Sequence, residues 1–178
     1  MKIKEELIKS DYKFKGKIFT VREDTVLLPN GQQANREVIE HPGGVSILAI
    51  TNDRKILMVE QFRAGPRIVT LEVPAGKLEY GEDPKACGLR ELVEETGYIA
   101  GKFEKIGSFY LTPGYANELI YIYVAKELTY DKSNPDNDEF LNVKAYDYET
   151  LLQMVMNNEI KDAKTVISIL FAKEYLKR

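Results

Sequence analysis

The sequence predicts a mixed α/β domain built in layers, preceded by a small strand-rich unit. Several short apolar runs favour strands, one long helical pattern lies mid-chain, and two more helical patterns close the chain. Strands and helices do not alternate strictly, which favours a layered α/β arrangement over a series of βαβ units. At 178 residues the chain is long enough for one ordinary domain with a small appendage.

The strand-rich unit is expected over residues 1–41. Residues 17–28 and 33–40 are β-compatible runs, and they are joined by Pro29-Asn30-Gly31, a strong turn signal. The segment His41-Pro42-Gly43-Gly44 then interrupts the pattern. We therefore place the domain boundary there.

The second domain, residues 42–178, is expected to open with a pair of strands. Val45–Thr51 and Ile56–Phe62 flank the turn Asn52-Asp53, and both runs are apolar enough to be central strands. Val69–Val73 is a further apolar strand. These runs supply the sheet of the layered domain.

Glu82–Thr96 is the clearest helix. Asp83 can cap it, Pro84 suits its first turn, and Gly97 can adopt the left-handed conformation that ends it. Two strands should follow, over residues 102–111 and 118–127, and then an acidic loop over residues 126–139. A last strand is expected over residues 140–146, and two helices over residues 148–156 and 163–176. Asp162 is placed to cap the last helix.

A projection of the central helix at about 100° per residue separates an apolar arc from an acidic one. The arc expected to face the core contains Ala86, Leu89, Leu92, Val93 and Thr96. Glu91, Glu94 and Glu95 fall opposite, beside Cys87 and Gly88. Such a cluster suggests a compensating cation, and Gly88 would let a loop or metal approach; the alternative is a solvated acidic face.

Composition limits the chemistry. With one cysteine (Cys87) and one histidine (His41), the chain can form no intrachain disulfide and no site of several imidazoles, so a metal site must use oxygen ligands. A net charge of −3 argues against a nucleic-acid-binding surface. No stretch approaches membrane-spanning length and no signal region is visible, so we expect a cytoplasmic protein.

One acidic motif carries the functional prediction. Gly76 and Glu82 enclose five residues, and Arg90-Glu91-Leu92-Val93-Glu94-Glu95-Thr96-Gly97-Tyr98 follows seven residues later. This run resembles the Nudix box; every charged and glycine position matches, and Tyr98 alone departs, at an aliphatic packing position. The resemblance implies a pyrophosphohydrolase with a Nudix-like α/β/α sandwich and a mixed sheet.

Further stretches resemble the ADP-ribose pyrophosphatase branch of that family. They are Glu40–Val45, Val59–Arg63, Leu71–Gly76, Thr112–Glu118 (with a proline sixteen residues after Gly97) and Asp162–Thr165. The resemblance implies Mg²⁺-dependent hydrolysis of ADP-ribose to AMP and ribose 5-phosphate, by a homodimer that exchanges its N-terminal strands. The alternatives are another nucleoside diphosphate derivative, such as a nucleotide sugar, or a non-catalytic nucleotide sensor.

The resemblance also implies roles for the box residues. Glu91, Glu95 and the backbone carbonyl of Ala75 would bind the metal together with Glu139 from the acidic loop. Mg²⁺ suits such ligands best, with Mn²⁺ as the alternative. Glu94 would act in catalysis by holding a bound water or a second ion. Arg90 would pair with carboxylates of the same box.

The general base is left open. Glu139 is the first candidate, but Asp136 or Asp138 could act instead, because Asn137 replaces a second glutamate common in relatives and cannot take a proton from water. Without the box, this loop would be interpreted as a disordered acidic connection.

Four residues are candidates for binding substrate. Arg63 and Arg36 would reach a phosphate or the nucleobase of the substrate. Glu72 could accept hydrogen bonds from adenine or ribose, or equally pair with a neighbouring lysine or arginine. Glu118 would contact the terminal ribose, while His41 is expected to be a turn residue.

Overall fold

The computed structural model describes residues 3–132 and 140–177, which form two compact units. One unit contains residues 1–43 and 110–119, and the other contains residues 44–109 and 120–178. No helix of the described residues is long and apolar enough to cross a membrane.

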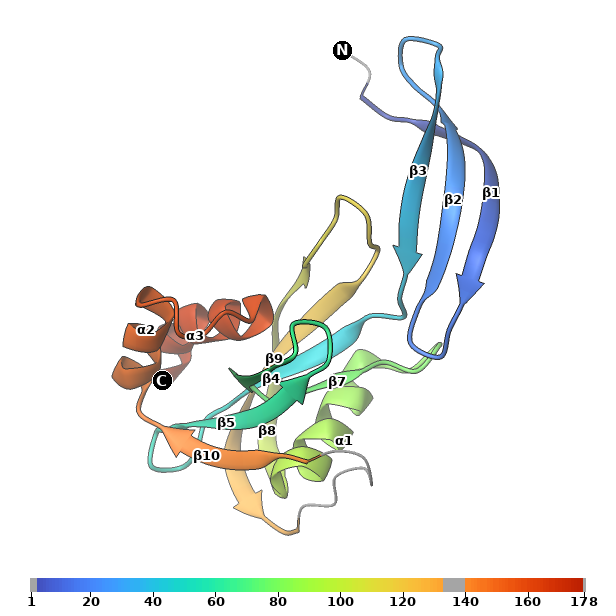
Figure 1. The fold of residues 1–178 in the computed structure, drawn as a ribbon. Coiled ribbons are helices and arrows are strands. Elements are labelled where there is room, and N and C mark those ends of the chain that lie inside the picture. Colours follow the sequence, from blue (N-terminus) through green and yellow to red (C-terminus); the bar gives the residue numbers. More distant parts are fainter. Residues whose placement is uncertain (1–2, 133–139, 178) are drawn as a thin grey trace. The chain divides into compact units, whose positions relative to one another are not determined.

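The first unit is a three-stranded antiparallel sheet in the order β1-β2-β3, drawn in blue in Figure 1. Its strands are β1 (Glu6–Lys15), β2 (Thr20–Leu27) and β3 (Gln33–Glu40). The predicted hairpin of β2 and β3 is confirmed, with Gly31 at φ 86° in the turn. Strand β1 was not predicted, because its mostly exposed residues show no strong apolar alternation.

The second unit contains two sheets and all three described helices. Its strands are β4 (Gly44–Ala49), β5 (Ile56–Arg63), β6 (Ile68–Glu72), β7 (Ala75–Lys77), β8 (Tyr98–Tyr110), β9 (Leu119–Tyr130) and β10 (Asn142–Tyr146). Its helices are α1 (Pro84–Thr96), α2 (Tyr148–Met156) and α3 (Ala163–Leu176). One sheet has the order β7-β4-β9-β8 and is mixed, since β4 runs parallel to β9 and antiparallel to β7; the other has the order β10-β5-β6.

The layers follow from alternation along β4. Val45, Ile47 and Ala49 belong to one buried cluster with Leu92 of α1, whereas Leu48 belongs to a second cluster. That second cluster also contains buried residues of α2 and α3, and Figure 1 shows these two helices side by side. The prediction of a layered α/β domain with a mixed sheet is therefore confirmed.

Two predictions about the strands were wrong. The runs at 45–51 and 56–62 do not pair as a hairpin: β4 and β5 lie in different sheets and share only the bridge between Ile50 and Ile56. All of β4 and the first half of β5 are buried, so each strand lies inside its own sheet with neighbours on both sides. The acidic loop also starts later than residue 126, because β9 continues to Tyr130.

Candidate active site

Helix α1 is fixed at both ends by the residues that the sequence predicts. The Asp83 carboxylate accepts a hydrogen bond from the Ala86 N–H at 2.9 Å. Gly97 takes the left-handed conformation (φ 75°) and its N–H donates to the Val93 carbonyl at 2.8 Å. Together these caps satisfy backbone groups that a helix end leaves unpaired. They fix where α1 begins and ends.

The expected orientation of α1 was partly wrong. Glu91 and Glu95 are buried together with Cys87 and Leu92, while Ala86, assigned to the core-facing arc, is exposed. The projection assumed that charged side chains face solvent. Here two carboxylates lie against the backbone of a neighbouring strand, where a polar partner is available, so burial does not leave them without hydrogen bonds.

That neighbouring backbone is the β6–β7 connection, residues 72–76. The Ala75 N–H donates to Glu95 Oε2 at 3.0 Å. A Cβ added to Gly76 would lie only 1.9 Å from Cδ of Glu91, so the missing side chain makes the space that the Glu91 carboxylate fills. Two carboxylates from α1 therefore meet this backbone at neighbouring residues, Glu95 at Ala75 and Glu91 at Gly76.

Arg90 binds the other carboxylates of the box, as the resemblance implied. Its Nη1 donates to Glu91 Oε1 and to Glu94 Oε2, both at 2.8 Å, and its Nη2 donates to Glu82 Oε1 at 3.2 Å. Burial opposes the charge of Arg90, but attraction to Glu91 and the bonds to Glu94 and Glu82 outweigh it and raise the pKa of the guanidinium. Arg90 thus organises the acidic face.

Arg63 and Glu72 lie together in the same unit, bonded to each other. Arg63 Nε donates to Glu72 Oε1 at 2.8 Å, and Arg63 Nη2 donates to Glu72 Oε2 at 2.7 Å. Thr70 and Lys164 also donate to the Glu72 carboxylate. Of the two roles considered for Glu72, this geometry favours pairing with cations. Lys164 was not predicted as a site residue, although the run Asp162–Thr165 carries part of the family resemblance.

Burial opposes ionisation of Glu72, but the hydrogen bonds and charges of Arg63 and Lys164 more than compensate and lower its pKa to about 2. Glu72 is therefore an anion at neutral pH. An anion already held by two cations is a rigid support for the Arg63 guanidinium.

The other two candidate substrate residues belong to the first unit. Arg36 on β3 forms a two-point ion pair with Glu5, with Nη2 at 2.6 Å from Oε1 and Nε at 3.1 Å from Oε2. Glu118 lies 3.4 Å from Nδ1 of His41, and the same nitrogen accepts from the Gly43 N–H. This bond fits the turn role expected for His41.

Comparison with known proteins decides the family. The chain matches the NUDIX domain over residues 40–167, and residues 5–39 match the nucleoside diphosphate sugar hydrolase N-terminal domain.

The chain belongs to the Nudix family.

Its relatives include enzymes with different substrates. An ADP-ribose pyrophosphatase of Bacillus subtilis is 43% identical over 94% of this chain and 91% of that protein. A methanol dehydrogenase activator of Bacillus methanolicus is 45% identical over 93% and 90%, and a GDP-mannose pyrophosphatase of Salmonella paratyphi B is 31% identical over 93% and 90%. A crystal structure of an ADP compounds hydrolase shares the fold, with a TM-score of 0.86 at 20% identity over 99% of this chain and 97% of that one. The predicted Nudix hydrolase fold is confirmed.

Nudix hydrolases generally need divalent metal ions. Among residues 3–132 and 140–177, no three histidine, cysteine, aspartate or glutamate side chains converge as a metal site. The donors still suit a hard cation, because carboxylates and a backbone carbonyl are the ligands that Mg²⁺ prefers. The close approach of Glu95 to the Ala75 N–H and of Glu91 to Gly76 also fits the Nudix arrangement. Glu139 and its acidic neighbours, Asp136 to Asp138, lie outside the described residues.

Two residues in the spacer between Glu82 and Arg90 have structural roles. A Cβ on Gly88 would lie 2.8 Å from the Phe103 ring, so this glycine admits an aromatic side chain rather than the loop or metal we expected. The Phe103 ring stacks on Tyr123 with centroids 4.7 Å apart. Burial, reinforced by the charges of Glu82 and Glu91, raises the pKa of Cys87 to about 12, which keeps its thiol neutral.

Proposed function

We propose that this protein is a divalent-metal-dependent pyrophosphohydrolase that splits ADP-ribose into AMP and ribose 5-phosphate. The observation that carries the proposal is the contact of Glu95 with the Ala75 N–H and of Glu91 with Gly76, inside a complete Nudix box. The similarity to the ADP-ribose pyrophosphatase of Bacillus subtilis supports the choice of substrate.

Glu91, Glu95, the Ala75 carbonyl and Glu139 would hold the metal, with Mg²⁺ as the first choice and Mn²⁺ as the second. When bound, such ions neutralise the pyrophosphate and lower the pKa of a coordinated water. Glu94 is only partly buried and would hold a water or a second ion. Its bond to Arg90 keeps the side chain in place while leaving one carboxylate oxygen for that role.

The base that takes a proton from the attacking water is proposed to be Glu139, with Asp136 and Asp138 as the other candidates. Asn137 cannot serve, because an amide is not basic at neutral pH.

Arg63 is the proposed phosphate-binding residue of the second unit. Glu72 fixes the guanidinium through two parallel bonds, so it contributes to substrate binding through Arg63 more than by its own contacts. Arg36 and Glu118 complete the proposed set. Arg36 would reach a phosphate or the adenine base of the substrate, and Glu118 would contact the terminal ribose. Arg36 would have to leave Glu5 or bind alongside it.

We further propose a cytoplasmic homodimer in which the N-terminal strands complete the partner's substrate pocket. The first unit leaves large apolar side chains exposed, among them Leu7, Tyr12 and Phe14 on β1 and Ile18 between β1 and β2. Exposed apolar side chains gathered on a small sheet are typical of a protein interface. The domain division at residue 41 remains part of this proposal.

Relative turnover of a substrate panel tests the proposal. ADP-ribose, ADP-glucose, GDP-mannose, NADH and a dinucleoside polyphosphate are compared at equal concentration with Mg²⁺, and ADP-ribose is expected to be among the best. A preference for GDP-mannose would instead favour the nucleotide-sugar alternative, for which the Salmonella relative is the precedent. Tight nucleotide binding without any turnover would favour the non-catalytic sensor.

A further inference from the structure

The first turn of α3 holds the β6–β7 connection from the side opposite α1. The Val73 N–H donates to the Thr165 hydroxyl oxygen at 3.0 Å, and Lys164 binds the Glu72 carboxylate. The next carbonyl, that of Pro74, accepts from the Ile47 N–H at 2.8 Å. The connection is therefore bonded on both sides just before Ala75 and Gly76, where Glu95 and Glu91 make contact.

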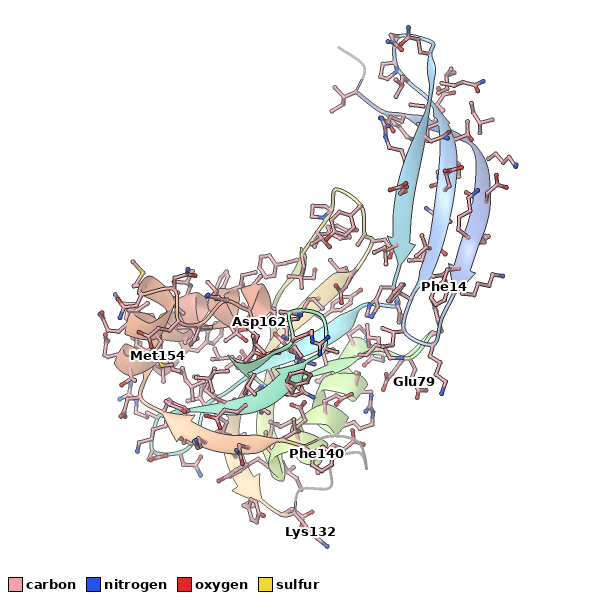
Figure 2. All side chains as sticks on the ribbon, viewed as in Figure 1. Phe14, Glu79, Lys132, Phe140, Met154 and Asp162 are labelled. Atoms are coloured by element: carbon pink, nitrogen blue, oxygen red, sulfur yellow. The ribbon has the colours of Figure 1, made fainter. Side chains whose placement is uncertain are left out.

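The Thr165 hydroxyl is itself oriented. Its Oγ1 donates to Asp162 Oδ2 at 2.6 Å, and the same carboxylate oxygen accepts from the Thr165 N–H at 3.0 Å. With its hydrogen committed to Asp162, the hydroxyl offers a lone pair to Val73. Thr165 is fully buried, so water does not compete for this bond. Figure 2 shows Asp162 at the start of α3.

We propose that Thr165 is a positioning residue for the cation site, acting through the backbone of residues 73–75. This inference rests on the proposed function for the assignment of Ala75 and Glu95 as metal ligands. Thr165 fixes the Val73 peptide, and Glu95 accepts from the Ala75 N–H two residues later. Freedom at residue 73 would therefore displace the Ala75 carbonyl and the Glu95 carboxylate together.

If Thr165 served only to stabilise the fold, its hydroxyl and the hydrogen bonds it makes would not be required. An apolar side chain at 165 could fill the same space, and buried ion pairs such as Lys164–Glu72 are weak evidence for stability, because removing charges from water is costly. Hydrogen bonds are directional, so the contacts of Thr165 and Lys164 fix one position of the β6–β7 connection relative to α3.

Thr165→Val is the direct test, because valine keeps the shape and removes the hydroxyl. Mg²⁺ affinity is measured by titration calorimetry on the full chain, with thermal unfolding in EDTA as the second readout. Thr165→Val should weaken Mg²⁺ binding roughly 10-fold, as loss of a supporting partner typically does. Thr165→Ser, which keeps the hydroxyl, should restore wild-type affinity.

Ser168→Ala is the matched control. Ser168 is also a buried hydroxyl of α3. It donates to the Lys164 carbonyl at 2.8 Å and lies 3.5 Å from the Ser46 hydroxyl, and neither contact involves residues 73–75. Ser168→Ala should lower the unfolding temperature without changing Mg²⁺ affinity. Equal Mg²⁺ affinity in Thr165→Val and wild type, or an equal loss in Ser168→Ala, would overturn the inference, as would a wild-type protein that binds no Mg²⁺.

Thr165→Ala is the second variant if the valine protein does not fold, since its smaller side chain lets water reach Val73. The same 10-fold loss is expected. Because the readout is cation binding, failure of ADP-ribose turnover alone would count against the proposed substrate and leave this inference standing.

Discussion

Glu72 is held by three neighbours at once, and its charge is a consequence of them. Arg63, Lys164 and Thr70 all donate to its carboxylate, which is almost fully buried. A carboxyl in that position without cations would keep its proton, because burial disfavours the charged form. At the scale of the residue, the cations therefore decide whether Glu72 can support Arg63.

Stability should depend on the ionisation of Glu72 in acid. Its pKa falls from an ordinary 4.5 to about 2 on folding, a change worth about 3 kcal/mol at most. Because the folded-state value is the lower one, this contribution is complete above pH 4.5 and is lost as the pH falls towards 2. Chemical denaturation of wild type and Glu72→Gln should differ most near neutral pH and converge near pH 2.

The matched control is Glu60→Gln, which changes the more exposed pair of Glu60 with Lys144. This variant should lose little stability at any pH, since exposed pairs contribute about 1 kcal/mol or less. A constant difference between wild type and Glu72→Gln from pH 7 down to pH 2 would contradict the account of Glu72.

At the scale of the elements, the site depends on how closely α1 approaches β7. Gly76 has no side chain where the Glu91 carboxylate lies, and Glu95 accepts a backbone hydrogen bond one residue earlier. Helix and strand therefore make contact through carboxylates and backbone rather than through apolar side chains alone. The caps at Asp83 and Gly97 fix the two ends of the helix that makes this contact.

Gly76→Ala should separate function from folding. The added methyl group would overlap Glu91, whose flexible side chain can move away while the backbone stays in place. We expect a small loss of unfolding temperature and a fall of roughly 10- to 100-fold in turnover. Gly65→Ala serves as the control, because nothing lies within 4 Å of its added Cβ. Unchanged turnover in Gly76→Ala would show that the position of Glu91 does not matter.

The elements also show what the sequence could and could not predict. The caps Asp83, Gly97 and Asp162 and the helices they bound were predicted correctly, because capping depends on local residues. The burial of Glu91 and Glu95 was not predicted, because it depends on a strand that the sequence does not mark as one. The role of Lys164 was not predicted either, because its partner Glu72 is distant in sequence.

At the scale of the whole molecule, the proposal places this chain in a homodimer. The exposed apolar side chains of the first unit support an interface, and the match to a nucleoside diphosphate sugar hydrolase N-terminal domain covers the same strands. Substrate residues are proposed in both units, Arg36 and Glu118 in the first and Arg63 in the second. Assembly and activity should therefore be linked.

Light scattering should give twice the 20.3 kDa mass of one chain. Leu7→Glu places a charge among the exposed apolar side chains of β1, so it should yield monomers with low activity. Lys9→Gln alters an exposed polar side chain of the same strand and should leave the dimer intact. A wild-type monomer with full activity would disprove the dimer.

Product analysis with Glu95→Gln tests whether the Nudix carboxylates carry the chemistry. Glutamine can still accept the Ala75 N–H bond, so the variant should fold, but it loses the charge proposed to bind the metal. With ADP-ribose and Mg²⁺, the wild type should yield equal amounts of AMP and ribose 5-phosphate, and EDTA should stop the reaction. Folded Glu95→Gln should be at least roughly 100-fold slower. Wild-type turnover in this variant, or turnover that is insensitive to EDTA, would contradict the claim that the Nudix carboxylates carry the chemistry.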